Sequence, residues 1–267
     1  MEENKQIEIT TFINPHMFWI VFEKNKEDRD KLEQILLEWN NSFKEAHITE
    51  GLAVVKDKQT WKRILIKSFN SNLNKYKGWL IDYGKNLTAE TVYELPKEFT
   101  GQHAIAHSAC LYNTIPLKSV LNVEQNKCIY EKQTRFNEGT IKIVKDYIQK
   151  ANLITFYIEN IYSNILCGSL HLVVNQNNIN VIEMLIEKGH VAKDVELFLQ
   201  AMKINMEKIL QNNVYSRPLQ KPENFFISES IGRGCLRNIQ VSLFIITNFL
   251  LFIFSLKHAY IYMAICN

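Results

Sequence analysis

Residues 78–96 read GWLIDYGKNLTAETVYELP, and this stretch decides the fold. An apolar run over residues 79–81 leads into a turn over residues 82–85, and a second strand-like segment follows at residues 92–95. Aspartate can hydrogen-bond the backbone of its own turn, and glycine adopts positive φ at no steric cost. Apolar segments on both sides of such a turn predict a hairpin of a small antiparallel barrel. Tyr83, at the tip, is then a candidate wall of a ligand site.

The composition indicates an intracellular globular protein. The chain has 267 residues, enough for one large domain or two small ones, and its net charge of +3 is too small to argue for nucleic-acid binding. Its five cysteines are an odd number without a CxxC pair, which favours a reducing compartment over a disulfide framework. The N-terminal stretch shows no pattern typical of a secretory signal.

Four short strand-like segments lie between residues 50 and 99 and are separated by polar residues. Short antiparallel strands at this spacing predict a small barrel rather than an α/β unit. A barrel of this size buries little surface by itself, so we expect it to lean on neighbouring structure. The four segments are LAVVK (52–56), WKRILIKSF (61–69), WLIDY (79–83) and TVYEL (91–95).

Two strands are also predicted before the barrel, at residues 7–12 and 18–23, on either side of a turn. A helix follows them, with Asn25 as its cap and a charged stretch, residues 24–31, as its solvated face. The apolar stripe of this helix consists of Leu32, Ile35, Leu36, Trp39 and Phe43.

After the barrel, residues 100–138 are predicted to be irregular because Pro116 interrupts them. A helix capped by Thr140 is expected next, followed by two strands at residues 153–161 and 165–174. The first and last pairs of strands are each too small to stand alone, so we expect them to share one sheet.

Two more helices are predicted near the end of this region. Asn180 caps the first, which Gly189 closes, and the second begins at Asp194. The predicted fold class is therefore mostly β with flanking helices (α+β), with the small barrel inserted into a second β domain.

Several short motifs occur in a fixed order along the chain. The turn itself is Ile81-Asp82-Tyr83-Gly84-Lys85. The other motif residues are Asn14, Pro15, His16, Met17, Phe18 and Trp19 in the first hairpin, Trp61, Lys62 and Arg63 in the barrel, Leu95, Pro96 and Phe99 after it, and Ile186, Glu187, Lys188, Gly189 and Ala192 near the late helix. This ordered set resembles the extended Tudor family, in which a Tudor barrel is inserted into a staphylococcal-nuclease-like (SN-like) OB-fold.

The resemblance also divides the chain. It implies an extended Tudor domain over residues 1–213. Within this domain, residues 46–112 are the Tudor barrel core, and residues 5–45 and 138–213 are the SN-like half. Residues 214–237 are polar, contain two prolines and are interpreted as a linker.

In this family the barrel binds methylated arginine in a cage of aromatic faces with one amide. By comparison, the cage is mostly absent here. Val55 and Leu80 stand where two aromatic residues would be. Lys62 replaces the tyrosine of Trp-Tyr-Arg and Lys85 replaces the asparagine, whereas Tyr83 is kept. Two lysines repel a guanidinium at short range, so we expect no methylarginine binding of the usual kind.

The retained Tyr83 has two interpretations that the sequence leaves open. It is either a packing residue of the barrel or part of a surface that still binds peptides. In the second case, Lys62 and Lys85 suit an acidic or unmodified partner. The other positions, Asn14, Pro15, Phe18, Trp61, Asp82 and Gly84, are expected to be structural.

The resemblance implies a protein-interaction module, not an enzyme, and no cofactor. The implied partners are Piwi-family proteins or other Tudor and germline-granule proteins of the piRNA pathway. Within the family, the chain is similar to the first Tudor domain of germline proteins whose longer forms resemble ATP-dependent RNA helicases. The implied location is the perinuclear, cytoplasmic germline granule (nuage).

The sequence favours ordinary packing over a catalytic or metal site. His103, His107 and Cys110 are close in sequence, but no fourth ligand follows at a zinc-like spacing. A nuclease needs clustered carboxylates and a basic group, whereas the first hairpin offers only Glu8 and Glu23 at its far ends. We expect a scaffold in this half and no metal site.

Binding of single-stranded RNA is the alternative function, because OB-like folds often bind single strands. It needs aromatic platforms interleaved with basic residues, whereas Phe156, Tyr157 and Tyr162 lie in a segment without lysine or arginine. We therefore expect nucleic acid to be bound indirectly or weakly. A further alternative is the N-terminal fragment of an RNA helicase, although these residues contain no GxxxxGK[ST] phosphate loop.

The last segment, residues 238–267, is apolar and contains an uncharged run over residues 239–256. This run is long enough for a transmembrane helix, with Arg233 and Arg237 on the cytoplasmic side. The other interpretation is a misplaced exon boundary, in which these residues stand in for the rest of a longer protein. A membrane is a partner only under the first interpretation.

Overall fold

The computed structural model describes residues 5–124 and 126–210, with side chains as far as Met202. The predicted linker 214–237 and apolar tail 238–267 lie outside the described residues. No helix within the described part of the chain is long and apolar enough to cross a membrane.

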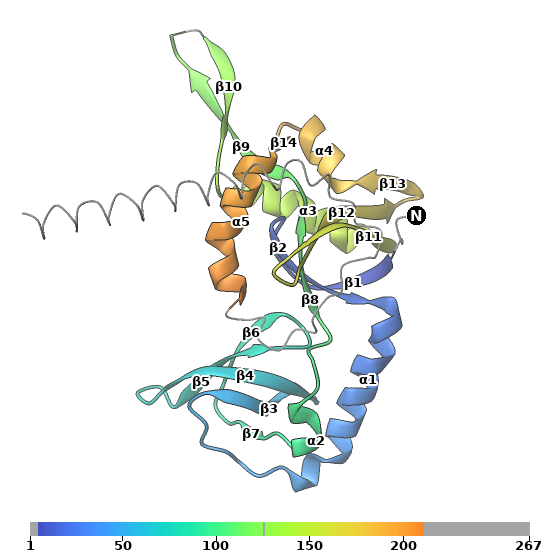
Figure 1. Cartoon of the computed structure of the whole chain (residues 1–267), viewed down its shortest axis with the longest axis vertical. Coiled ribbons are helices and arrows are strands. Elements are labelled where there is room, and N and C mark those ends of the chain that lie inside the picture. The colour runs from blue at the N-terminus through green and yellow to red at the C-terminus, as the bar shows by residue number, and fades with distance from the viewer. Residues whose placement is uncertain (1–4, 125, 211–267) are drawn as a thin grey trace, which may run out of the picture. The chain divides into compact units, whose positions relative to one another are not determined.

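One sheet collects strands from both ends of the described chain. Its members are β1 (Lys5–Asn14), β2 (Met17–Phe22), β8 (His107–Leu111), β11 (Leu153–Tyr162), β12 (Ile165–Val174) and β13 (Asn177–Asn180). The strand order is β11-β1-β2-β8-β12-β13 (Figure 1). The prediction that the first and last strands share a sheet is therefore confirmed.

A five-stranded antiparallel barrel sheet is inserted between β2 and β8. Its strands are β3 (Gly51–Asp57), β4 (Thr60–Asn70), β5 (Lys75–Leu80), β6 (Lys85–Ala89) and β7 (Tyr93–Glu94), in the order β6-β5-β4-β3-β7. The hairpin prediction was wrong in its second strand, because β6 follows the turn and pairs with β5. Tyr93 instead lies opposite Val54 of β3. The polar sequence of β6 explains the error, since this edge strand buries little apolar surface.

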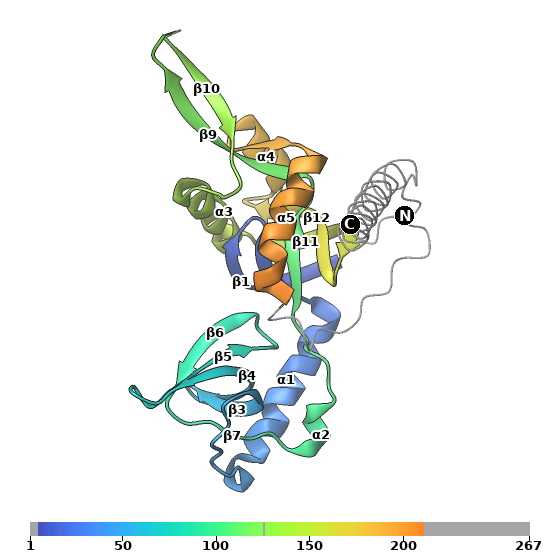
Figure 2. The same ribbon diagram turned by 60° about the vertical axis from the view of Figure 1, so that its left-hand side comes forward.

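Residues 100–138 are not irregular, contrary to the sequence-based prediction. Besides β8, they contain β9 (Thr114–Asn122) and β10 (Lys127–Lys132), which form an antiparallel hairpin. The base of β9 pairs with β14 (Val191–Lys193). We call residues 117–132 the arm, because this part of the hairpin projects from the rest of the described chain (Figures 1 and 2).

The helices pack around the two sheets. They are α1 (Glu23–Glu38), the 3-10 turn η1 (Asn40–Ser42), α2 (Lys97–Thr100), α3 (Glu138–Lys150), α4 (Val181–Glu187) and α5 (Val195–Leu210). Asn180 caps α4, as predicted. Two other predicted caps were wrong. The cap of α3 is Asn137, whose side chain accepts from the Thr140 backbone N–H, and α1 begins at Glu23, before Asn25.

The barrel leans on both α1 and the six-stranded sheet, as its small size led us to expect. Trp19 and Val21 of β2 form one apolar cluster with Leu65 and Trp79 of the barrel. The ring centroids of Trp19 and Trp79 are 4.8 Å apart. A second cluster joins α1 to the barrel and contains Leu32, Leu36, Val54, Trp61, Leu95 and Phe99.

Candidate peptide-binding site

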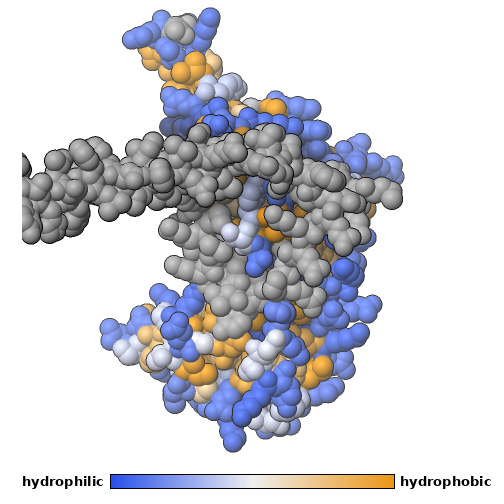
Figure 3. Space-filling model, viewed as in Figure 1, coloured by the Kyte–Doolittle hydropathy of each residue, from blue (hydrophilic) through white to orange (hydrophobic). Residues whose placement is uncertain are grey.

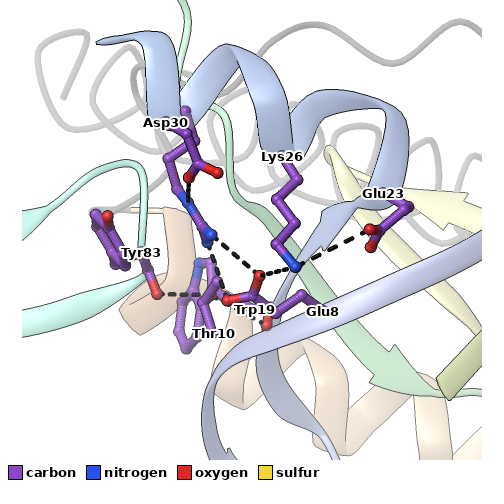
Figure 4. A network of polar contacts seen from close by, with 8 residues as sticks. Glu8, Thr10, Trp19, Glu23, Lys26, Asp30 and Tyr83 are labelled. Carbon is purple, nitrogen blue, oxygen red and sulfur yellow. Dashed lines mark hydrogen bonds and ion pairs between the residues drawn. The ribbon is translucent and has the colours of Figure 1, made fainter. Parts of the chain in front are cut away.

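The turn over residues 82–85 is fixed to the rest of the chain by its backbone. The carbonyl oxygen of Tyr83 accepts a hydrogen bond of 2.8 Å from the hydroxyl of Thr10 (Figure 4). It accepts another, of 2.9 Å, from the hydroxyl of Thr11. Gly84 has φ +63°, and a Cβ at this position would overlap the indole of Trp19. The glycine is therefore needed both for the turn conformation and for close contact with β2.

Asp82 has a different role from the one predicted. Its carboxylate accepts from the Arg63 guanidinium at 2.9 and 2.6 Å and from the backbone N–H of Ile105 at 3.0 Å. Arg63 also donates to the carbonyl oxygens of Gln102 and His103, at 2.8 and 3.0 Å. Asp82 thus forms a buried ion pair across the barrel instead of capping its own turn.

The remaining structural motif residues lie in packed or hydrogen-bonded positions. The Asn14 side chain accepts from the His16 backbone N–H at 2.8 Å, and the carbonyl oxygen of Pro15 accepts from Leu111 at 2.8 Å. Phe18 is fully buried in the core of the six-stranded sheet. Trp61 packs between the rings of Phe43 and Tyr93, with centroids 4.6 and 5.0 Å away.

The structure brings the degenerate cage positions together at one end of the barrel. Val55 of β3 lies opposite Lys62 of β4, and Leu80 of β5 lies opposite Lys85 of β6. Val55 and Leu80 are each 1% exposed and pack in the barrel core, so they do not present a surface to a ligand. Lys85 is exposed, whereas Lys62 and Tyr83 are half-buried.

The ring of Tyr83 already faces cations from the same chain. The Lys62 ammonium lies 4.5 Å from the ring centroid, and the Arg29 guanidinium carbon lies 5.3 Å from it. Lys62 also donates to the Asp57 carboxylate at 2.9 Å, and this hydrogen bond lowers the pKa of Asp57. Lys62 thus occupies the aromatic face of Tyr83, and its ion pair with Asp57 holds it there.

Helix α1 adds charged groups to this site that the sequence-based interpretation missed. Arg29 is 7% exposed and makes two hydrogen bonds of 3.0 Å to the carboxylate of Glu8, beside an ion pair from Lys26 (Figure 4). The interpretation of residues 24–31 as a fully solvated face was therefore wrong at this position. The sequence spacing could have predicted this burial, because Arg29 precedes Leu32 by three residues and so lies on the buried face of α1.

Glu33 of α1 also lies near these cations. Burial raises the pKa of its carboxyl, although the charges of Lys62 and Arg29 oppose the effect. Its Oε1 atom is buried and has no hydrogen-bond partner among the described residues. Carboxylates therefore surround the lysine and arginine that face Tyr83.

A groove of about 380 Å³ opens beside Val55, between the two edge strands of the barrel sheet. Leu87 and Tyr93 contribute apolar walls, and Lys56 and Lys75 contribute positive charge. Of the cage positions, only Val55 lines this groove, which is large enough for a side chain.

The residues weighed as metal ligands do not form a cluster. Cys110 is fully buried and lies 3.1 Å from Cys167, Sγ to Sγ, and burial raises the pKa of its thiol. His107 packs against Phe22, with ring centroids 5.2 Å apart, and His103 is exposed. Within the described ranges, no three His, Cys, Asp or Glu side chains are placed to hold a metal ion.

Comparisons with known proteins agree with this architecture. The model of the Tudor domain family matches residues 1–113. The extended Tudor domain TD3 of mouse TDRD1, solved with a MILI peptide containing dimethylarginine, is 16% identical, with a TM-score of 0.57 over 73% of this chain and 95% of that one.

Two further solved structures are similar. The extended Tudor domain of human TDRD1, solved with a symmetrically dimethylated E2F peptide, is 12% identical, with a TM-score of 0.57 over 73% of this chain and 92% of that one. The extended Tudor domain of BmPAPI, solved with sDMA, is 13% identical, with a TM-score of 0.58 over 72% and 100%. No curated protein matches the sequence significantly. Residues 1–113 thus match the Tudor domain family, and the described chain has the mostly β fold of extended Tudor domains.

Proposed function

We propose that this chain is a protein-interaction module, not an enzyme, and that it binds peptide segments without requiring methylarginine. The Tudor match and the extended Tudor fold support the first part. The similar domains of mouse TDRD1 and BmPAPI were solved with a dimethylarginine-containing MILI peptide and with sDMA, which supports a Piwi-family protein as the kind of partner.

The contact between Lys62 and Tyr83 carries the second part of the proposal. A bound guanidinium would have to share the ring with an ammonium that lies 4.5 Å from the ring centroid. Two unit charges at about 4 Å repel by about 4 kcal/mol at the effective dielectric constant of a protein surface. The attraction of a cation for one aromatic face is only about 0.5–2 kcal/mol. A guanidinium that came this close to the Lys62 ammonium would therefore be repelled more strongly than the ring attracts it. The Arg29 guanidinium, 5.3 Å from the same ring centroid, has the Glu8 carboxylate to offset its charge.

The charges at this end of the barrel fit a peptide with acidic or unmodified side chains. Lys85 is exposed and lies at the start of the edge strand β6. Lys56 and Lys75 line the neighbouring groove, whose walls include Leu87 and Tyr93. An acidic residue next to an apolar one would match this combination.

The test is a fluorescence-polarisation titration of the full chain with Piwi N-terminal peptides, each prepared unmodified and symmetrically dimethylated on arginine. We expect the dissociation constants of the two forms to differ by no more than about twofold, because the incomplete cage does not stabilise the methyl groups. A tenfold or greater preference for the dimethylated form would overturn the proposal. Binding of neither form would remove Piwi tails as partners.

A matched variant rebuilds the cage. Combining Lys62→Tyr with Lys85→Asn removes both lysines and gives these two positions the residues that the resemblance implies. Leu80 is left unchanged because it packs in the barrel core. We expect a preference for dimethylarginine to appear only in the rebuilt chain. Lys56→Tyr, on the neighbouring strand, is the control and should leave the preference unchanged.

We further propose that the chain acts in the piRNA pathway, in the cytoplasmic germline granule. The sequence resemblance to the first Tudor domain of Tudor domain-containing protein 12 supports this placement, and longer forms of such proteins resemble ATP-dependent RNA helicases. A tagged full-length chain that stays diffuse in germ cells, apart from granules marked by a Piwi protein, would contradict it.

A further inference from the structure

The arm, residues 117–132, exposes several apolar side chains, although the ring of Tyr130 lies beside Gly189. All six residues of β10 are exposed. The exposed fraction is 64% for Leu121, 81% for Val123 and 58% for Tyr130. Figure 3 shows hydrophobic residues among the hydrophilic ones on this projection. An isolated two-stranded hairpin is marginally stable in water, so a partner strand would stabilise it.

The outer edge of β10 is where a partner strand would fit. In the sheet β10-β9-β14, β10 is an edge strand, and no described strand pairs with its outer side. Such an edge presents a row of backbone N–H and C=O groups to solvent. Natural proteins usually protect exposed edges by charge or by covering structure, whereas here Ile129 and Tyr130 lie in the middle of the strand.

The sequence of β10, Lys127–Lys132 (KCIYEK), is complementary to itself. We propose that two copies of this chain associate by antiparallel pairing of β10 with β10, centred on Ile129. In this register Lys127 of each copy lies opposite Glu131 of the other, and Ile129 lies opposite Ile129. Lys127 and Glu131 form no ion pair within the described residues, so both charges are available for it.

On one face of the resulting four-stranded sheet, a row of apolar side chains lies beside a row of charged ones. Val120 lies opposite Ile129 within each hairpin, so the pairing forms a continuous stripe of four β-branched side chains. Lys118 lies opposite Glu131, and Lys127 of the second copy completes an alternating row of charges beside the stripe. Cross-strand pairs of both kinds contribute roughly 0.2–1 kcal/mol each in antiparallel sheets.

The opposite face covers the exposed aromatic ring. Tyr130 of one copy lies opposite Cys128 of the other, and Cys128 lies opposite Leu121 within its own hairpin. Each tyrosine therefore gains an apolar neighbour from the other copy, in addition to Leu121, which lies diagonal to it within its own hairpin. The two-fold symmetry repeats this contact, as expected of an isologous interface.

Charge selects this register over its neighbour. A two-fold axis between Ile129 and Tyr130 would place Lys127 opposite Lys132 at both ends of the pairing. Like charges directly opposite each other destabilise a sheet. A slip of one residue also moves every side chain to the other face, which would break the apolar stripe.

The test uses charge reversal in the full chain, with two differently tagged copies and co-purification as the readout. Lys127→Glu alone and Glu131→Lys alone should each reduce self-association at least tenfold. The two variants mixed together should recover it, because both charge pairs between the two β10 strands are then complementary. The double variant K127E/E131K should also recover it. Equal self-association of all variants, or no recovery in the mixture, would overturn the proposal.

A crosslink checks the register. Ile129→Cys combined with Cys128→Ser places a thiol on the two-fold axis, and mild oxidation should give a 129–129 linked peptide by mass spectrometry. Val120→Cys, on β9 of the same face, is the control and should not link to itself. The crosslink should disappear with K127E and return with K127E/E131K. A 129–129 yield no higher than that of the Val120 control would contradict the proposed axis.

Discussion

The turn over residues 82–85 and the arm, residues 117–132, use their side chains in opposite ways. In the turn, the carboxylate of Asp82, the carbonyl of Tyr83 and the surface of Gly84 are all occupied by contacts within the chain. In the arm, every residue of β10 is exposed. The segment with the family motif thus stabilises the fold, whereas the segment without a motif has the more open surface.

This difference explains why the motif is a better guide to architecture than to ligand choice. Ile81 packs against Trp19 of β2, and the Asp82–Arg63 pair crosses the barrel. These contacts are present although Val55 and Leu80 are aliphatic at the positions where the sequence resemblance implies aromatic cage residues. Side chains at the cage positions can therefore vary while the turn is kept, because the turn is held by the Asp82 carboxylate, the Tyr83 carbonyl and Gly84 and not by those side chains.

Removing the Asp82 carboxylate should have the largest effect of the changes that test this comparison. Asp82→Ala leaves the Arg63 guanidinium buried without its charge partner. Breaking a buried ion pair on one side costs about 3–5 kcal/mol. We expect a loss of this size in the free energy of unfolding, measured by urea denaturation with circular dichroism.

The matched control is the half-buried pair on the same barrel. Asp57→Ala removes the partner of Lys62, which can then turn to solvent, so the expected loss is about 1 kcal/mol or less. Equal losses in the free energy of unfolding of the two variants would mean that the Asp82–Arg63 pair stabilises the fold no more than the Asp57–Lys62 pair does.

The sequence predicts the barrel and the shared sheet because most of their strands are short apolar runs separated by polar residues, and these runs are largely buried in the structure. It fails at β9 because Pro116 resembles a strand breaker. Pro116 lies near the start of β9, where its carbonyl oxygen still accepts from the Gln133 backbone N–H. A proline near a strand end removes only one donor, so the strand survives.

The cage positions could be found from the motif, but their contacts could not. Lys62 reaches Tyr83 from β4, the strand next to β5, and Arg29 reaches it from α1. Such contacts depend on how the helix packs against the barrel, which local sequence patterns do not specify. The partner of Asp82 was missed for the same reason, because Arg63 lies nineteen residues earlier in the chain.

A methyl group at Gly84 should have the next largest effect. Gly84→Ala forces an L-residue to φ +63° and drives its Cβ into the Trp19 indole. The left-handed conformation alone costs about 1–2 kcal/mol, and overpacking adds about 1–3 kcal/mol. Gly101→Ala is the control, since nothing lies within 4 Å of its Cβ position, and it should change stability by no more than about 0.5 kcal/mol. Similar urea midpoints for both variants would show that the turn can move away from Trp19.

The base of the arm should respond to acid. His16 is fully buried, and its Nε2 lies 2.8 Å from the carbonyl oxygen of Thr114, the first residue of β9. Burial lowers the pKa of His16 from 6.5 to about 4, against the opposing effect of this hydrogen bond. The unfolded chain therefore binds a proton below about pH 6.5 that the folded chain resists until about pH 4.

Stability must then fall as the pH drops through this window, because the unfolded state binds more protons. At pH 5 the expected loss from His16 is about 2 kcal/mol relative to pH 7.5. The measurement is urea unfolding of the wild-type chain and of His16→Gln at both pH values. Glutamine keeps a donor for Thr114 but does not titrate, so the variant should lose about 2 kcal/mol less than the wild type on acidification. The carboxylates titrate in both proteins and cancel in this difference. An equal loss in the two proteins would show that His16 is protonated in the fold, and that the arm is held at its base by a charged contact.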